Sequence, residues 1–246
     1  MITIQNISKT YKGKVNVKAL QGITLTLDKG VYALLGPNGA GKSTLMKILT
    51  LSMRPDSGEV LWDGCSIARC ESKYRSILGY MPQQQTLYNG FRGRTFLNYM
   101  AVLKDLPKQT IQNEITKVSE NVNLLDKLDE KIAGYSGGMK QRLLLASAIM
   151  GAPQFVILDE PTAGLDPRER VRTRRLAKRI SERSTVLFAT HVVSDIEEIA
   201  DKVIILCKGE VVAFDTPINL IKATPDAQNL EDVYMYYFGR AEDELC

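Results

Sequence analysis

The chain has 246 residues, a formal net charge of +4 and 44% hydrophobic residues, which allows one large domain with a buried core. Its apolar stretches, such as 203–207, are far shorter than the roughly 18 residues of a membrane-spanning helix. The first residues lack a signal-peptide pattern, so we expect neither a membrane span nor export of this chain. Four cysteines without metal-ligand spacing predict reduced thiols, and the modest charge does not by itself indicate nucleic acid.

The beginning of the chain predicts strands. Apolar residues alternate from Ile2 to Ile7 and again over 23–27, and a turn signal lies at 28–30. The next residues, 31–35, form a nearly unbroken apolar run, as expected of a strand that is buried on both faces. We therefore expect a β-rich beginning that leads into a core strand.

A phosphate-binding loop is predicted directly after that strand. The segment matches the pattern G-x-x-x-x-G-K-[ST] with Gly36, Pro37, Asn38, Gly39, Ala40, Gly41, Lys42, Ser43 and Thr44. Glycines let backbone N–H groups surround phosphates, Lys42 reaches the β and γ oxygens, and the Ser43 hydroxyl suits Mg²⁺. A helix from Thr44 would direct its positive end at the anion. A turn without a ligand is the alternative, which the strand, loop and helix order disfavours.

The middle third predicts helices. Apolar residues recur at helical spacing, and strand signals nearly vanish between Thr95 and Ile149. Gln83 precedes this region, directly after Gly79-Tyr80-Met81-Pro82, at the junction between a strand and the helical part. Two roles of Gln83 stay open at this point: a polar contact with a ligand, and a turn position without a ligand.

A second candidate anion site lies at 135–142, which read YSGGMKQR. Ser136, Gly137 and Gly138 at a helix start would present exposed N–H groups and a hydroxyl to an anion. Taken alone, an ordinary helix N-cap explains the same residues equally well.

Two carboxylates follow the next buried strand. Asp159 and Glu160 come directly after the apolar run 155–158, at the sheet edge where α/β proteins bind ligands. Asp159 suits the Mg²⁺ shell, and Glu160 suits orienting and deprotonating an attacking water. Capping of a helix that begins at Pro161 is the alternative, but the presence of Lys42 favours catalysis.

The last third alternates strands and helices, which is typical of a parallel sheet covered on both faces. His191, the single histidine, follows the apolar run 185–189, where a γ-phosphate contact would arise. A structural or surface role is the usual one for a lone histidine. A hairpin is predicted at 208–209. Basic residues over 168–179 predict an amphipathic helix with a solvated face rather than a polyanion site, and the aromatic residues of 234–238 predict a docked terminal helix.

Read together, these segments resemble the ATP-binding subunits of ABC transporters. The matching elements, in order, are GPNGAGKST (36–44), GYMPQ (79–83), YSGGMKQR (135–142), FVILDEPTAGLD (155–166) and TH (190–191). They cover nearly the whole chain. The sequences of 161–170 and of the C-terminal segment 230–238 look most like those of stand-alone ATPases of drug, antibiotic and peptide export systems. Tyr135 and Met139 depart from the family, which usually has Leu and often Gln there.

The resemblance implies an α/β fold with a P-loop NTPase core of the ABC type. A mostly parallel sheet would carry helices on both faces, beside an antiparallel β-rich N-terminal part and an inserted α-helical subdomain. The single domain 1–246 would comprise a RecA-like core with the β subdomain (1–83 and 151–222), a helical subdomain with the signature motif (84–150) and a tail (223–246).

The resemblance also implies a role for each site residue. Tyr11 would stack on adenine, and Ser136, Gly137 and Gly138 would close on ATP held by a second subunit. The residues implied for catalysis are Gln83, Glu160 and His191, and those implied for the metal are Ser43, Gln83 and Asp159. The cofactors would be ATP and Mg²⁺.

The implied partners are a second ATPase subunit, forming a homodimer, and separately encoded transmembrane permease subunits. Residues 164–166 would cross the dimer interface, and the helices after Gln83 would dock on the permease at the cytoplasmic face of the membrane. A soluble assembly ATPase, of the type that loads iron-sulfur scaffolds, is the main alternative. A nucleic-acid machine is disfavoured, because the chain has no long coiled-coil insertion, zinc module or second cassette.

Overall fold

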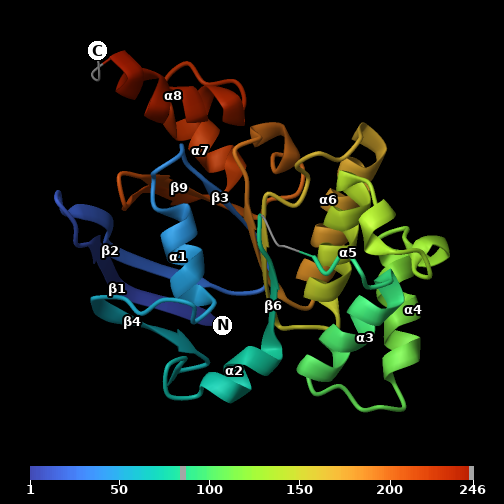
Figure 1. Cartoon of the computed structure of the whole chain (residues 1–246). Coiled ribbons are helices and arrows are strands. Elements are labelled where there is room, and N and C mark those ends of the chain that lie inside the picture. The colour runs from blue at the N-terminus through green and yellow to red at the C-terminus, as the bar shows by residue number, and fades with distance from the viewer. Residues whose placement is uncertain (84–86, 244–246) are drawn as a thin grey trace.

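Two β-sheets organise the chain, which a computed structural model describes over residues 1–83 and 87–243 (Figure 1). The strands are β1 (Ile2–Tyr11), β2 (Val17–Leu27), β3 (Gly30–Leu35), β4 (Ser57–Trp62), β5 (Cys65–Ser66), β6 (Leu78–Met81), β7 (Phe155–Asp159), β8 (Thr185–Ala189), β9 (Lys202–Cys207) and β10 (Glu210–Asp215). The helices are α1 (Lys42–Leu49), α2 (Glu71–Ile77), α3 (Gly93–Leu103), α4 (Ile111–Asn121), α5 (Gly137–Ile149), α6 (Pro167–Ser181), α7 (Pro217–Ala223) and α8 (Leu230–Asp243). Short 3₁₀ turns lie at η1 (Leu125–Lys127), η2 (Ile132–Gly134) and η3 (Val193–Asp195).

The first sheet is antiparallel and confirms the expected β-rich beginning. Its strand order is β2-β1-β4-β5, and β1 pairs with both β2 and β4. Ile2, Ile4 and Ile7 of β1 are all buried, as the alternation of apolar residues predicted. This sheet covers α1 and one side of the second sheet through a shared apolar cluster.

The second sheet is the mostly parallel core that the sequence predicted. Its order is β10-β9-β3-β8-β7-β6, and only β10, which returns from β9 through the hairpin at 208–209, runs antiparallel to its neighbour. All six residues of β3 are buried. Val31, Ala33 and Leu35 join the cluster under the helical part, whereas Tyr32 and Leu34 join the cluster under the antiparallel sheet. Two cores on opposite faces of one strand explain its unbroken apolar run.

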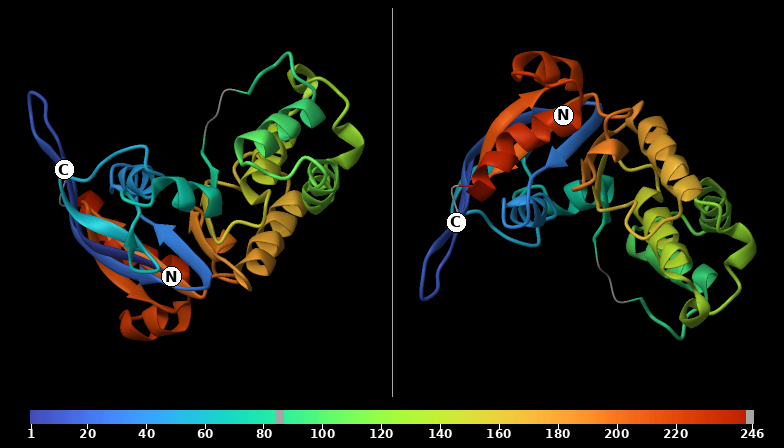
Figure 2. Two further views of the ribbon diagram at one scale, coloured as in Figure 1. Left: turned by 90° about the horizontal axis from the view of Figure 1, so that it is seen from below. Right: turned by 90° about the horizontal axis from the view of Figure 1, so that it is seen from above.

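Helices α3, α4 and α5 form the helical part that the middle third predicted. Figure 2 shows them to one side of the sheets, with the hairpin between β1 and β2 projecting on the other side. Lys104, at the end of α3, joins two of these helices, because its Nζ donates to the carbonyl oxygens of Ala148 (3.3 Å) and Met150 (3.0 Å) at the end of α5. Burial lowers the pKa of Lys104 to about 8, although Glu114 opposes this shift.

The C-terminal segment docks as a helix, as predicted. Leu230, Val233 and Phe238 of α8 are buried in the same core cluster as the helical part, and α8 packs on α7 and η3. Within 1–83 and 87–243, no helix combines the length and the apolar character that crossing a membrane requires.

The family departure at Tyr135 is accommodated by a matching small residue. The Tyr135 side chain is buried, and its hydroxyl donates to the carbonyl oxygen of Lys127 at 2.6 Å. A Cβ atom placed on Gly93 would lie 2.3 Å from that hydroxyl and 3.3 Å from Leu128. Gly93 therefore leaves the room that the larger Tyr135 side chain occupies.

We predict that Gly93→Ala destabilises the protein, although glycine to alanine near the start of a helix ordinarily stabilises it. The expected loss is about 1–3 kcal/mol of unfolding free energy, since overpacking a filled site costs that much. Tyr135→Phe removes the clashing oxygen, so Gly93→Ala should cost less in that background. Urea unfolding of the four proteins measures the coupling, and equal losses in both backgrounds would contradict this account.

Candidate functional site

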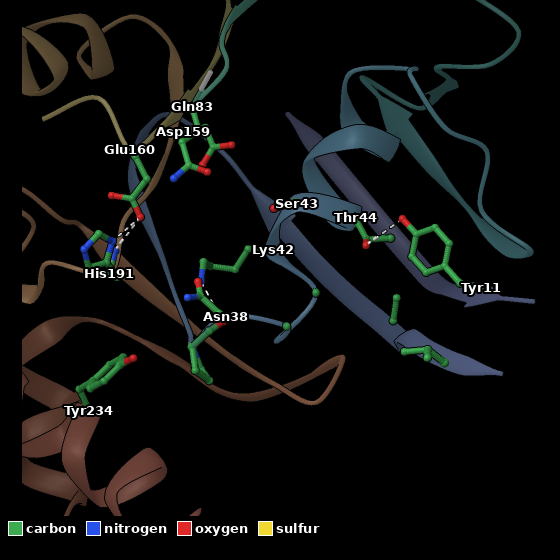
Figure 3. Close-up of a pocket in the computed structure, with 15 residues that line it drawn as sticks. Tyr11, Asn38, Lys42, Ser43, Thr44, Gln83, Asp159, Glu160, His191 and Tyr234 are labelled. Atoms are coloured by element: carbon green, nitrogen blue, oxygen red, sulfur yellow. Dashed lines mark hydrogen bonds and ion pairs between the residues drawn. The ribbon is translucent and has the colours of Figure 1, made fainter. Parts of the chain in front are cut away.

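Most of the predicted site residues line one cavity of about 630 Å³ at the edge of the core sheet (Figure 3). They are Tyr11, Pro37, Asn38, Gly39, Gly41, Lys42, Ser43, Thr44, Gln83, Asp159, Glu160 and His191. Gly36 and Ala40 belong to the same loop but do not line this cavity. Residues from β1, from the loop after β3 and from the ends of β6, β7 and β8 therefore converge on one space.

The predicted phosphate loop connects β3 to α1. The helix begins at Lys42, two positions before the predicted start at Thr44. Gly41 immediately precedes it with φ of 108°, and a Cβ there would lie 2.4 Å from the carbonyl oxygen of Ala19. Only glycine fits this position, which lets the loop turn directly into the N-terminus of a helix, where backbone N–H groups attract anions.

The Lys42 ammonium lies over its own loop. Its Nζ donates to the carbonyl oxygens of Gly36 and Pro37, the latter at 3.1 Å. Burial lowers the pKa of Lys42, and the carboxylates of Glu160 and Asp159 oppose that shift. A cation in this position is partly desolvated, which strengthens its attraction for a polyanion.

Two tyrosines border the cavity from opposite ends of the chain. The Tyr11 hydroxyl lies 3.2 Å from Thr44 Oγ1 and 3.5 Å from Met53 Sδ, and the residue is 40% exposed. Tyr234 of α8 also lines the cavity, and Figure 3 shows the two rings on opposite sides of the loop. Each offers an aromatic face at the rim.

Three oxygen-bearing side chains near the ends of β6 and β7 and the start of α1 share the inner side of the cavity. These are Ser43, Gln83 and Asp159, and Figure 3 shows them facing the same space. Burial raises the pKa of Asp159, and neighbouring Glu160 adds to the rise, while the backbone N–H of Gln83 and the Lys42 ammonium oppose it. Hydroxyl, amide and carboxylate oxygens are the hard ligands that Mg²⁺ prefers. Among the described residues there is no cluster of three His, Cys, Asp or Glu side chains that could hold a metal ion.

Glu160 is held by residues that follow the neighbouring strand β8. Thr190 Oγ1 donates to Glu160 Oε2 at 3.1 Å, and the backbone N–H of His191 donates to Oε1 at 3.1 Å. The His191 ring Nδ1 lies 2.7 Å from the same Oε1. Helix capping, the alternative function of this carboxylate, is wrong, because α6 begins at Pro167 and the Asp166 side chain caps it.

The signature residues lie outside this cavity. Ser136 caps α5, and its Oγ accepts a hydrogen bond from the backbone N–H of Met139 at 3.2 Å. Within one chain, Ser136 therefore acts as the helix N-cap that the sequence allowed. Ser136 and Gly137 are exposed and Gly138 is half-buried, and none of the three lines the cavity with Lys42. One chain therefore does not bring the two predicted anion sites together.

Residues 20–163 match the ABC transporter family. The chain belongs to this family. It is the ATP-binding subunit of an ABC transporter, and it hydrolyses ATP to power transport. The expected α/β fold with a helical subdomain is confirmed by likeness to solved ABC cassettes. One is a bacterial ABC transporter cassette solved as a dimer, with a TM-score of 0.81, 24% identity, and coverage of 88% of this chain and 98% of that one.

Two curated relatives of this ABC ATPase carry different functions in their names, resistance and import. The linearmycin resistance ATP-binding protein LnrL of Bacillus subtilis is 33% identical over 222 residues, covering 89% of this chain and 70% of the relative. The methionine import ATP-binding protein MetN of Carboxydothermus hydrogenoformans is 36% identical over 222 residues, covering 86% of this chain and 65% of the relative.

A buried ion-pair network behind the ATPase site was missed by the sequence analysis. Asp195 of η3 is buried, and its Oδ2 accepts Thr162 Oγ1 at 2.6 Å and the Arg170 guanidinium at 2.9 Å. Arg174 lies 3.7 Å from its other oxygen. The predicted solvated face of α6 is therefore wrong for Arg170 and Arg174, which turn inwards. No local pattern marked Asp195, since its partners are distant in sequence.

We predict that Asp195→Ala lowers the free energy of unfolding by about 2–3 kcal/mol, because Thr162, Arg170 and Arg174 lose the buried carboxylate that they share. Asp129→Ala is the matched control. The Asp129 side chain is 67% exposed and pairs with Arg94, so its removal should cost less than about 1 kcal/mol. Urea unfolding compares the two variants, and similar losses would contradict a structural role for the buried network.

Proposed function

We propose that two copies of this ABC ATPase close around two molecules of Mg·ATP, and that each site takes residues from both copies. The observation that carries the proposal is the separation of the two anion-binding motifs within one chain. Lys42, Asp159 and Glu160 line the cavity, whereas Ser136 lies outside it on an exposed helix start. A second copy can present its Ser136, Gly137 and Gly138 to the open cavity. The dimeric cassette of the same fold supports this arrangement.

Each residue of the cavity then has a defined task. Backbone N–H groups of 36–44 and the Lys42 ammonium bind the phosphates. The exposed ring of Tyr11 offers a face on which adenine stacks. Ser43, Gln83 and Asp159 would hold Mg²⁺, which, when bound, neutralises charge on the β and γ oxygens.

Glu160 is proposed as the general base. Its carboxylate accepts a proton from a water whose oxygen attacks the γ-phosphorus, and the bond from that phosphorus to the ADP oxygen breaks, which releases phosphate. The contacts from Thr190 and His191 fix the carboxylate beside the phosphate loop. Since His191 Nδ1 is engaged with Glu160, its Nε2 is the atom left for a contact with the γ-phosphate.

The transmembrane permease would dock on the helical part. Four large apolar residues are exposed there, at or near α3, namely Tyr88, Tyr99, Val102 and Leu103. Leu103 also lines a groove between α2 and the end of α3. Docking at this surface would place the subunit at the cytoplasmic face of the membrane as a peripheral protein. ATP-driven closure moves α3 with the rest of the helical part and so transmits force to the permease.

Export is the proposed direction of transport. The resistance function in the name of LnrL supports it, whereas the import function in the name of MetN supports the opposite direction. ATP-dependent accumulation of cargo in inverted membrane vesicles that contain the purified permease is expected for an exporter. Uptake only into right-side-out vesicles would identify an importer.

We predict that Glu160→Gln slows ATP turnover by about 10² to 10⁴, because an amide cannot accept the proton of the attacking water. ATP binding should persist, since the phosphate loop is intact, and the unhydrolysed nucleotide should trap the dimer. Steady-state phosphate release, nucleotide titration and size-exclusion chromatography with Mg·ATP measure the three effects.

Glu120→Gln is the control, because Glu120 is exposed on α4. It should retain the wild-type turnover and form no trapped dimer. Near-normal hydrolysis by Glu160→Gln would remove Glu160 from the role of base. A strictly monomeric ATP-loaded variant, alone and with its permease, would reject the shared site.

We predict that Val102→Asp weakens co-purification of the permease while basal ATPase activity stays near the wild-type value. The reason is that a charge replaces part of the exposed apolar surface of α3. Val15→Asp is the matched control, since Val15 is 78% exposed on the hairpin far from α3. Extraction in mild detergent followed by affinity purification measures the partner. Equal recovery of the permease with Val102→Asp and with the wild-type chain would contradict docking at this surface.

A further inference from the structure

Glu160 has a backbone conformation that its residue type disfavours. Its φ is 51°, in the left-handed region that residues other than glycine rarely adopt. Such a conformation persists only where the surrounding contacts impose it, and it is common at functional sites. The contacts that hold the main chain of Glu160 therefore help decide where its carboxylate points.

Three hydrogen bonds fix the peptide groups on either side of the Glu160 Cα atom. Its N–H donates to the carbonyl oxygen of Ala189 at 2.9 Å. Its carbonyl oxygen accepts Gln141 Nε2 at 2.8 Å and the N–H of Ala163 at 3.2 Å. Because the orientations of both peptide planes set φ and ψ, these bonds also set the direction of the Cα–Cβ bond.

Gln141 is the one of these partners that comes from the helical part. It lies a little over one turn into α5, and Ser136 caps the same helix. The following seven residues, 143–149, are all buried, which fixes α5 firmly in the core. Ser136 and Gln141 thus move as one body. In the proposed dimer, the N-terminus of α5 faces the nucleotide that the partner holds. The Gln141 side chain of the same helix contacts the main chain of this subunit's own Glu160.

We propose that Gln141 is a positioning residue for hydrolysis, which aims the Glu160 carboxylate by holding the Glu160 carbonyl group. The proposal rests on the proposed function of Glu160 as the base. It also gives the two ATP sites of a dimer a direct connection. When Ser136 of one subunit contacts the nucleotide bound by its partner, a shift of α5 would change the contact between Gln141 and Glu160 of the same subunit. That contact orients the base at this subunit's own ATP site.

The variant that tests this is Gln141→Met in the full-length chain. Methionine keeps the length and the helix propensity of glutamine but has no N–H donor. We expect kcat to fall about 3- to 10-fold, the size expected when a neutral hydrogen bond is lost. KM for ATP and ATP-dependent dimer formation should be unchanged, because Gln141 does not line the cavity.

Two further variants, a second test and a control, complete this measurement. Gln141→Asn keeps the amide but shortens the side chain by one methylene, so it should lose the contact and lower kcat similarly, even if the methionine variant folds poorly. Gln112→Ala is the control, because Gln112 is an exposed glutamine on α4, and it should leave kcat at the wild-type value.

A double-mutant cycle separates positioning from a structural role. If Gln141 acts through Glu160, Gln141→Met should cause no further loss in the Glu160→Gln background, measured by single-turnover hydrolysis. The same fold-loss in both backgrounds, or wild-type kcat for both Gln141 variants, would overturn the proposal. Failure of the base itself is distinguishable, because Glu160→Gln alone would then retain near-normal turnover.

Discussion

The parallel pairing of the core strands is the constraint on which the ATP site depends. In the register of the sheet, Asp159 lies beside Ala189, and Ala189 lies beside Leu34. Residues that follow these strands consequently emerge at one edge, as is general for parallel sheets. Gln83, Asp159 and His191 meet the phosphate loop there although they are far apart in the chain. The two apolar cores on opposite faces of β3 hold this edge in place.

The electrostatics of the cavity suit a ligand that brings charges of both signs. Burial disfavours the charged form of Lys42 and, independently, that of Asp159. The Lys42 ammonium and the Asp159 carboxylate partly compensate one another in the free protein, since each opposes the pKa shift of the other. In the proposed dimer, a triphosphate with its divalent cation would supply a better partner to each group, so that the closed state would depend on the nucleotide.

A continuous set of contacts links the proposed permease surface to the main chain of Glu160, the proposed base. Lys104 ties the end of α3 to the end of α5 through two carbonyl oxygens, and Gln141 ties the other end of α5 to Glu160. The signature residues begin that same helix. The helix therefore connects the end of α3, the signature residues and Glu160, and its burial makes it stiff enough to transmit small displacements.

The sequence alone determined the class of fold, the loop between β3 and α1 and the ATPase family, because these rest on local patterns: apolar runs of strand length, glycines before Lys42, and short motifs in a fixed order. It also placed the docked helix α8 and the helices of the middle third. Only the tertiary structure decided the partners of Asp195, the room that Gly93 leaves for Tyr135, and the hydrogen bond from Gln141 to the main chain of Glu160. Each of these is a contact between residues remote in the chain, whose geometry depends on how sheets and helices pack, and no local pattern encodes it.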